Sequence, residues 1–450
     1  MKSINPYSEK VIKTYASFKS NEIFDIINEA NNSFNDWKNI TLKNRINIIL
    51  KIKQNLIDDR LESAKEITSE MGKPLSESLL EIDKCVWLCD YYIENSEKLL
   101  KPEFIKTEAH KSYITFEPLG IILGIMPWNF PFWQVFRFVI PTIISGNVTI
   151  IKHAPNVTGC CLRIKKIFSK NINYKVLQPL VIDVDEIENI IKNPLVKGVS
   201  LTGSDKAGSA VAKITGKYIK KTLLELGGSD AFIVCKDADV DKAAKKAVIA
   251  RMLNTGQSCI AGKRLLLHER IAEEFMEEFV KQVKELKSGD TMDEDTFIGT
   301  LAREDLAEDL EKQIQDSVKQ GAKIVLGGKR DKAYYEPTII TNVKKGMPVF
   351  DQETFGPAMA VTTFKEDQEA IDLVNYSDFG LGVSIFTEDF TFAEKIVPAF
   401  EDGAVFVNEL VKSDPRLPFG GTKISGYGRE LSSHGIQEFV NRKTVYFNKY

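Results

Sequence analysis

Short apolar runs alternate with helix-like segments through the middle of the chain, and this alternation restricts the possible folds more than any other feature. Four runs have the length and composition of strands: Gly120–Met126, Val148–Ile151, Lys197–Thr202 and Ala231–Val234. Strands buried on both faces are nearly continuous in apolar residues, and strand–helix alternation is typical of parallel sheets covered by helices. The sequence therefore predicts an α/β fold.

The flanking segments carry other patterns. Residues 21–101 show helical periodicity, which Met71–Pro74 interrupts once. Tyr113–Pro118 alternates like a strand, and Thr444–Phe447 near the C-terminus is again rich in strand-forming residues. Because 450 residues exceed what one compact core accommodates, we expect two domains, the second starting near residue 227, and a small β element.

Charge and composition exclude several classes of protein. The net charge of −3 provides no basic field for nucleic acid. The N-terminus lacks the apolar core of a secretory signal, and the longest apolar runs, such as Val139–Ile144, are too short to span a bilayer. Six cysteines give no disulfide framework. Cys85 and Cys89 lie four residues apart on one helix face but have no second ligand pair nearby, and no histidine has ligand spacing with another. We therefore expect a cytoplasmic enzyme with no metal site and no membrane or nucleic-acid partner.

Three residues carry groups suited to covalent chemistry at a carbonyl carbon. Cys259 follows a glycine-containing loop, Glu225 is flanked by leucines, and Asn129 lies between two prolines. A thiolate can attack a carbonyl and leave a thioester, which a carboxylate can help water to hydrolyse. An amide held in a stiff loop can stabilise the developing oxyanion. Together these groups point to the oxidation of an aldehyde through a thioester.

The order and spacing of several motifs resemble those of the aldehyde dehydrogenase superfamily along nearly the whole chain. The matching motifs are Pro127–Pro131, Lys152, Thr202–Ser204, Leu224–Gly228, Gly256–Cys259, Glu353–Pro357 and Pro418–Gly421. Within the superfamily, Lys152–Asn156 and Leu226–Asp230 are most similar to a bacterial-type succinate-semialdehyde dehydrogenase subgroup. The resemblance implies a Rossmann-like cofactor domain, an α/β catalytic domain and a small β element that joins subunits.

Domain boundaries also follow from this resemblance. Residues 1–102 and 119–226 are expected to form the NAD(P)-binding domain and residues 227–426 the catalytic domain. Residues 103–118 and 427–450 are expected to form an oligomerisation element, so the resemblance implies a homodimer or a homotetramer.

The resemblance assigns the catalytic roles to the same three residues. Cys259 is the expected nucleophile and Glu225 the expected general base, whose pKa apolar surroundings raise. Asn129, with the backbone N–H of Cys259, is the expected oxyanion donor. Each has a structural alternative, namely a buried free cysteine, a capping or ion-paired glutamate, and a turn-forming asparagine.

A dinucleotide site is implied without a GxGxxG motif. The residues assigned to the cofactor are Trp128, Lys152, Pro155, Thr202, Gly203, Ser204, Gly208, Leu226, Glu353 and Phe355. The turn from Gly203 to Gly208 follows a strand and opens a helix, which suits a pyrophosphate but is also an ordinary connection. Many NAD-using relatives carry a glutamate at the place of Pro155, and that carboxylate repels a 2′-phosphate. The expected cofactor is NADP or NAD, and the missing glutamate favours NADP.

Three residues are candidates for substrate binding: Arg137, Ser413 and Arg416. Some semialdehyde dehydrogenases carry a carboxylate-binding arginine at the place of Arg137, and an arginine fork matches a carboxylate. The alternative is an arginine on a helix surface. Ser413 and Arg416 lie where family members shape the mouth of the substrate site.

Other positions depart from the family pattern. Leu253 replaces a second substrate-binding arginine that one semialdehyde group carries. Phe138 replaces a relay lysine of many relatives, so the usual partner of that lysine, Glu430, is left with a structural role.

We predict NAD(P)-dependent oxidation of a small aldehyde, with succinate semialdehyde as the substrate. A broad aliphatic or glyceraldehyde dehydrogenase is the alternative. A CoA-acylating enzyme is less favoured because such relatives commonly lack the glutamate found at position 225, and a non-enzymatic scaffold is disfavoured because all three catalytic residues are present.

Overall fold

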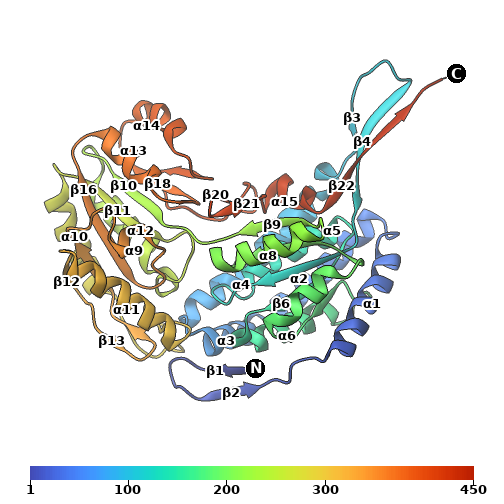
Figure 1. The fold of residues 1–450 in the computed structure, drawn as a ribbon, viewed down its shortest axis with the longest axis horizontal. Coiled ribbons are helices and arrows are strands. Elements are labelled where there is room, and N and C mark those ends of the chain that lie inside the picture. The colour runs from blue at the N-terminus through green and yellow to red at the C-terminus, as the bar shows by residue number, and fades with distance from the viewer. Residues whose placement is uncertain (450) are drawn as a thin grey trace.

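The computed structural model describes residues 1–449 and consists of two α/β halves and a projecting arm (Figure 1). The N-terminal half contains the first strands and helices of the chain together with residues 426–438. The C-terminal half is formed by residues 230–407, and the arm projects from the far side of the N-terminal half (Figure 1). The fold thus agrees with the α/β class that the sequence predicts.

A six-stranded sheet forms the centre of the N-terminal half. Its strands are β5 (Ile121–Met126), β6 (Val148–His153), β7 (Leu177–Pro179), β8 (Val196–Thr202), β9 (Lys221–Glu225) and β21 (Gly426–Tyr427). They lie in the order β21-β9-β8-β5-β6-β7, and only β21 is antiparallel to its neighbour. The strand order reverses beside β5, because β6 and β7 lie on one side of it and β8 and β9 on the other. Such a switch point opens a crevice at the carboxyl ends of the strands, where ligands of α/β sheets bind.

Helices cover this sheet. They are α1 (Ser20–Trp37), α2 (Leu42–Asp58), α3 (Arg60–Met71), α4 (Leu75–Leu99), α5 (Trp133–Ile144), α6 (Thr158–Ser169), α7 (Ile187–Lys192), α8 (Asp205–Lys217) and α15 (Ser432–Glu438). The predicted interruption at Met71–Pro74 is confirmed: α3 ends where Gly72 takes a φ of 83°, and Pro74 precedes α4. The positive φ favours glycine, and proline cannot continue the preceding helix.

A seven-stranded sheet forms the centre of the C-terminal half. Its strands are β10 (Asp230–Val234), β11 (Gly262–His268), β12 (Lys323–Leu326), β15 (Thr338–Thr341), β16 (Ala358–Phe364), β18 (Val383–Phe386) and β19 (Val405–Val407). Their order is β12-β15-β16-β11-β10-β18-β19, and only β12 is antiparallel to its neighbour. The helices of this half are α9 (Val240–Met252), α10 (Ala272–Lys284), α11 (Glu304–Lys319), α12 (Pro348–Asp351), α13 (Asp367–Asn375) and α14 (Phe390–Ile396).

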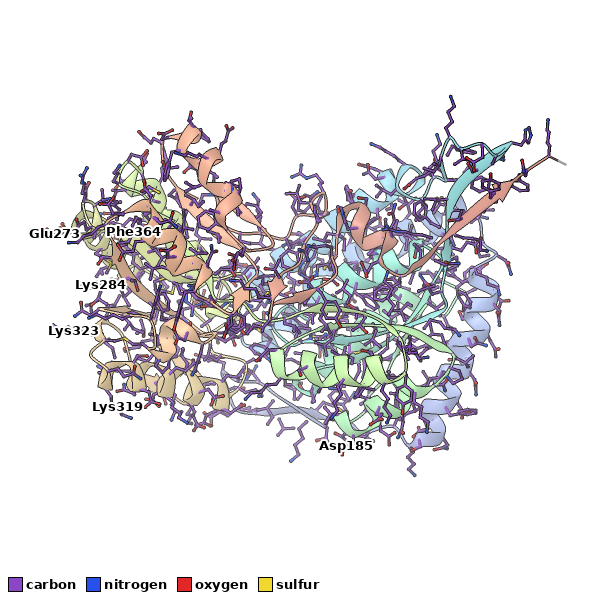
Figure 2. All side chains as sticks on the ribbon, turned by 45° about the horizontal axis from the view of Figure 1, so that its top comes forward. Asp185, Glu273, Lys284, Lys319, Lys323 and Phe364 are labelled. Carbon is purple, nitrogen blue, oxygen red and sulfur yellow. The ribbon has the colours of Figure 1, made fainter. Side chains whose placement is uncertain are left out.

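Both faces of this sheet are buried. Ala231 and Ile233 of β10 belong to one core cluster, whereas Phe232 and Val234 belong to another. The alternation follows from the two-residue period of a strand and explains why this segment is apolar throughout. The labelled Lys284, Lys319 and Lys323 lie at the outer edge of this half (Figure 2).

The arm is a three-stranded antiparallel sheet in the order β22-β4-β3. Its strands are β3 (Glu103–Phe104), β4 (Lys111–Pro118) and β22 (Val440–Phe447). The strands predicted at Tyr113–Pro118 and Thr444–Phe447 are therefore confirmed. Residues 427–439 differ from the expected oligomerisation element, because α15 packs against α5 and Ile436 and Phe439 are buried in the core of the N-terminal half. An apolar face on α15 thus draws this segment away from the arm.

Short strand pairs complete the structure. They are β1 (Lys2–Ile4) with β2 (Val11–Thr14), β13 (Arg330–Asp331) with β14 (Tyr334–Tyr335), and β17 (Phe379–Gly380) with β20 (Thr422–Lys423). Within residues 1–449, no helix combines the length and the apolar character that crossing a membrane requires.

Candidate active site

Cys259 lies at the boundary of two cavities. One, of about 420 Å³, opens at the switch point of the six-stranded sheet and is called here the crevice cavity; its lining includes Trp128, Asn129, Thr202, Leu226, Glu353 and Phe355. The other, of about 200 Å³, is called the helix cavity; its lining includes Glu77, Glu81, Lys84, Trp133, Arg137 and Phe419. Cys259 and Gln134 line both. Cys259 is partly exposed, whereas the other five cysteines are buried.

The loop before Cys259 has an unusual backbone. Asn254, Thr255 and Gly256 have φ values of 56°, 51° and 72°. A Cβ atom on Gly256 would lie 2.2 Å from the carbonyl oxygen of Gly356, so only glycine fits there. The loop is anchored by the hydroxyl of Thr255, which accepts a hydrogen bond of 3.0 Å from Gly299 N. These contacts fix the direction in which the next residues, including Cys259, project.

Asn129 is tied to the same loop by two hydrogen bonds. Its Nδ2 donates to the carbonyl of Gln257 at 3.2 Å, and its carbonyl accepts from Asn254 Nδ2 at 2.9 Å. An amide nitrogen carries two protons, so one remains for another acceptor. The sequence-predicted nucleophile and oxyanion donor are thus brought together on two bonded loops.

A buried carboxylate holds the segment that carries Asn129. Glu81 accepts hydrogen bonds from Phe132 N at 2.8 Å and from Trp133 N at 2.9 Å, at the start of α5. It also pairs with Lys73 at 2.6 Å, and the Lys73 ammonium lies 4.0 Å from the ring centre of Phe130. Because negative charge is favourable at a helix N-terminus, Glu81 fixes the entry of α5 beside Cys259.

Burial and charge act in opposite directions on the Cys259 thiol. Burial raises the pKa of Cys259 to about 12, while Lys263 and Arg137 lower it. The Lys263 ammonium is fully buried and donates to the carbonyls of Cys259 at 2.5 Å and Ser258 at 2.9 Å. Because burial is the larger effect, the resting thiol is protonated at neutral pH.

Glu225 is the last residue of β9 and is buried. Burial, and then the neighbouring Glu430, raise its pKa well above the ordinary value of a glutamate. Its Oε1 faces Gly420, where an added Cβ would lie 2.7 Å away, and has no hydrogen-bond partner among residues 1–449. Glu225 lines neither of the two cavities that Cys259 lines.

The crevice cavity gathers most of the residues predicted to bind a cofactor. Thr202 is the last residue of β8, Gly203 and Ser204 follow it, and Ser204 caps α8 by accepting from Ala207 N at 3.3 Å. Thr202 Oγ1 is buried and without a hydrogen-bond partner in the described chain. Gly208 lies directly under Leu226, since a Cβ atom there would meet the leucine side chain at 2.5 Å.

The opposite wall of the crevice cavity comes from the C-terminal half. Phe355 meets Trp128 edge to face, with ring centres 5.6 Å apart. Glu353 accepts a hydrogen bond of 3.0 Å from Gly228 N and lies 3.3 Å from the Lys263 ammonium. Cofactor candidates from both halves therefore face one another across this cavity.

Lys152 and Pro155 lie at the end of the neighbouring strand, outside the residues that line the crevice cavity. Lys152 is buried, which lowers its pKa, and it forms no ion pair among residues 1–449. Pro155 is exposed and begins a short 3₁₀ helix, Pro155–Val157. No acidic side chain occupies this position.

The helix cavity contains Arg137. This residue is 2% exposed, so the alternative of an arginine on a helix surface is wrong. Its guanidinium forms an ion pair with Glu430 and lies 4.7 Å from the ring centre of Phe419. Arg137 Nη2 is buried and has no hydrogen-bond partner among residues 1–449.

The structure separates the two remaining substrate candidates. Ser413 lines the helix cavity and accepts a hydrogen bond of 2.8 Å from Lys84. The side chain of Arg416 is 66% exposed, pairs with Asp414 at 2.6 Å and lines neither cavity. Asp414, two residues earlier, holds the Arg416 guanidinium outside both cavities, so a role for Arg416 at the mouth of the substrate site stays a prediction.

Sequence reasoning missed three polar residues around Cys259: Lys84, Gln134 and Lys263. Lys263 is the second residue of β11, and in the sequence it is indistinguishable from a lysine at an exposed strand end. Lys84 carries a weak signal, since Glu77, Glu81 and Lys84 share one helix face through their spacings of four and three residues. That face would have been assigned to solvent.

Comparisons with known proteins agree with this geometry. The model of the aldehyde dehydrogenase family matches residues 1–445. A Synechocystis protein named probable succinate-semialdehyde dehydrogenase of the NADP(+) type is 41% identical over 448 residues, which cover 99% of each chain. The Escherichia coli NAD(P)+ succinate semialdehyde dehydrogenase Sad is also 41% identical, over 99% of this chain and 97% of its own. The crystal structure of a Streptococcus pyogenes succinic semialdehyde dehydrogenase with NADP+ has a TM-score of 0.97 at 33% identity, with full coverage of both chains.

Proposed function

The chain belongs to the aldehyde dehydrogenase family, and from this premise we propose that it oxidises succinate semialdehyde to succinate with NADP⁺. The substrate named for the Synechocystis and E. coli relatives supports the substrate, and the NADP named for the first of them supports the cofactor. The residues of the two cavities support the same assignment independently.

The observation that carries the proposal is the position of Cys259 between the two cavities. An aldehyde carbon bound to its sulfur has the crevice cavity on one side and the helix cavity on the other. The first is placed at the sheet switch point, where a dinucleotide binds, and the second is closed by apolar side chains around Arg137. The crevice cavity therefore serves hydride removal, and the helix cavity holds the substrate tail.

Cys259 carries the covalent steps. Its sulfur attacks the aldehyde carbon, and loss of hydride from the adduct leaves a thioester. NADP⁺, when bound in the crevice cavity, supplies the hydride acceptor. The free Nδ2 proton of Asn129 and the Cys259 N–H stabilise the oxyanion of the adduct.

Hydrolysis of the thioester needs a base. Glu225 takes the proton of the attacking water, and the acid and the free thiol are released. The raised pKa of Glu225 suits this role, since a carboxylate with a higher pKa is a stronger base. Its side chain must turn from Gly420 toward Cys259 for this step.

The residues of the cofactor site fit a 2′-phosphorylated dinucleotide. The buried hydroxyl of Thr202 lacks a partner among residues 1–449, and Ser204, which lines the crevice cavity, caps the N-terminus of α8, an end that suits a phosphate. Lys152 has no carboxylate partner among residues 1–449, and the exposed Pro155 supplies no negative charge to repel a phosphate. These residues would hold the pyrophosphate and the adenosine ribose.

Arg137 is suited to the terminal carboxylate of the substrate. Its Nη2 is buried without a hydrogen-bond partner among residues 1–449, and the ring of Phe419 covers the guanidinium. A buried donor without a partner is costly, and an incoming carboxylate compensates that cost. Glu430 balances the charge of Arg137 when the cavity holds no substrate.

The proposal is tested by comparing kcat/KM for succinate semialdehyde and for butanal, each with NADP⁺ and with NAD⁺. Arg137→Ala alone would leave Glu430 as an unpaired buried charge, which is strongly destabilising. We therefore compare Glu430→Gln with the double variant Arg137→Met/Glu430→Gln. The wild type and Glu430→Gln should favour succinate semialdehyde by about 2–3 kcal/mol, and the double variant should lose this preference while still oxidising butanal.

Equal kcat/KM values for the two aldehydes in the wild type would contradict the substrate assignment and leave a broad aliphatic aldehyde dehydrogenase. A higher turnover on addition of CoA would contradict the hydrolytic step. A preference for NAD⁺ would contradict the role given to the residues around Pro155.

A further inference from the structure

Lys84 is a charged residue of the helix cavity that the chemistry above does not use. It lies on α4, and its ammonium donates a hydrogen bond of 2.8 Å to the hydroxyl of Ser413. The same ammonium lies 4.3 Å from the ring centre of Trp133. Lys84, Ser413, Arg137 and Cys259 all line this one cavity.

The other charged residues of the cavity already have partners. Arg137 pairs with Glu430, Lys412 with Glu409, and Glu81 with Lys73. Glu77 accepts a hydrogen bond of 2.7 Å from Asn254 N. It lies seven residues before Lys84 on α4, which separates the two by about 10 Å along the helix axis.

Lys84, by contrast, forms no ion pair among residues 1–449, and its partners are a hydroxyl and an aromatic face. An ammonium in a mostly apolar cavity without a counter-ion is unfavourable, and an anion that enters the cavity relieves this cost. The neighbouring Leu253 supplies no charge to the cavity. Among residues 1–449, Lys84 is therefore the one cation of the cavity without a paired carboxylate, and Arg137, although paired with Glu430, keeps its Nη2 free.

We propose that Lys84 is a second ligand for the terminal carboxylate of the substrate, and that Lys84 and Arg137 together select aldehydes that carry a carboxylate. This inference rests on the proposed function. Two cations from different helices, α4 and α5, bracket the substrate tail, while Ser413 donates its own proton to the carboxylate and accepts from Lys84. The carboxylate compensates the charge of Lys84, which has no anionic partner in the empty cavity.

The test compares Lys84→Met, which removes the charge and keeps the length of the side chain, with Lys84→Arg, which keeps the charge. Lys98→Met, on the same helix but outside the cavity, is the matched control. In Lys84→Met we expect kcat/KM for succinate semialdehyde to fall about tenfold or more, through KM, because a hydrogen bond to a charged group is lost. Butanal kinetics should change less than about twofold, Lys84→Arg should recover most of the loss, and Lys98→Met should behave as wild type.

Three outcomes decide between the claims. A wild type that does not prefer succinate semialdehyde overturns the proposed function, whatever the variants do. If the wild type prefers succinate semialdehyde and Lys84→Met retains that preference, the role of Lys84 is overturned and the proposed function stands. An equal loss for both aldehydes, or a loss that Lys84→Arg does not recover, assigns Lys84 to the structure of α4 and overturns its role in selection. If Lys84→Met does not fold, Ser413→Ala, which removes the hydroxyl that holds the Lys84 ammonium, repeats the comparison, and an unchanged preference for succinate semialdehyde in that variant overturns the inference.

Discussion

Two opposing effects set the acidity of the Cys259 thiol. Burial raises its pKa to about 12, and the charge that lowers this pKa most is Lys263, which donates to the carbonyl of Cys259 at 2.5 Å. Arg137, which lines the helix cavity with Cys259, acts in the same direction as Lys263. Because the thiolate is the reactive form, alkylation of the resting protein should accelerate with pH across the whole accessible range.

Lys263→Met should slow the alkylation of Cys259 by iodoacetamide. The loss of the buried ammonium removes the largest effect that lowers the pKa of Cys259, so less thiolate is present at any pH. The rate constant, followed by mass spectrometry of the Cys259 peptide between pH 7 and about 10, should be about tenfold lower in the variant. Lys98→Met is the control. A wild-type rate that levels off near pH 8 and does not depend on Lys263 would contradict this account.

The selectivity for a carboxylate should depend on pH through Lys84. Burial, and then Arg137, lower the pKa of Lys84 to about 8, whereas Glu81, Cys85 and Asp414 act in the opposite direction. The protonated ammonium therefore predominates below pH 8 and is lost above it. The ratio of kcat/KM for succinate semialdehyde to that for butanal should fall above about pH 8 in the wild type and stay level in Lys84→Arg. A ratio that is level in both would exclude titration of Lys84.

At this scale the sequence predicts the residues that belong to short motifs. Cys259, Asn129 and Thr202 meet around one cavity because fixed backbone features position them. Cys259 follows a glycine-containing loop, Asn129 lies between two prolines, and Thr202 ends β8. Lys84 was missed because a lysine on an amphipathic helix is indistinguishable from a solvated one until its neighbours are known. The position of Arg416 depends on its pair with Asp414, which the spacing of the motifs does not reveal.

At the scale of the element, the loop before Cys259 depends on Gly256. Its φ of 72° and its approach to the carbonyl of Gly356 leave no room for a side chain. We expect Gly256→Ala to lower the free energy of unfolding by about 2–4 kcal/mol, through backbone strain and overpacking, and to abolish most activity. Urea unfolding and kcat measure the two effects.

Gly216→Ala is the matched control. This glycine lies in α8, and an added Cβ would meet nothing within 4 Å. Replacing a helical glycine by alanine should stabilise the protein by about 0.5–1 kcal/mol without changing kcat. Equal effects of the two substitutions would contradict the special role given to the Gly256 loop.

Strands and helices were predictable where a local pattern of apolar residues specifies them. The apolar runs that form β5, β6, β8 and β10 have the period and length of buried strands. The edge strand β21 was not predictable, because two residues near the C-terminus pair with β9, about 200 residues earlier in the chain, only after both have been positioned by tertiary packing. The same long-range packing moves α15 from the expected arm onto α5.

At the scale of the whole molecule, the arm presents apolar surface that the single chain does not cover. Phe104 is 65% exposed and Phe447 is 50% exposed, and both belong to its three-stranded sheet. Exposed apolar side chains on a sheet with open edges are a typical surface for a second chain. We infer that the arm joins subunits into a dimer or a tetramer.

Removing the residues after Asn441 should therefore lower the oligomeric order. The truncation removes most of β22, which pairs with β4 along its whole length. A chain that ends at Phe447 retains β22 and is the control. Light scattering after size-exclusion chromatography should give a smaller particle for the first truncation only, and the same mass for both would contradict the role of the arm.

The two halves and the cavities between them support one central claim, that Cys259 forms a thioester with a carboxylate-bearing acyl group. The measurement that tests it most directly uses Glu225→Gln, in which hydrolysis should be slow. Mixed with succinate semialdehyde and NADP⁺, this variant should release one equivalent of NADPH in a burst and carry one succinyl group on the Cys259 peptide, as seen by mass spectrometry. Cys259→Ala should show neither. A burst without an adduct on Cys259, or an adduct on another cysteine, would contradict the account.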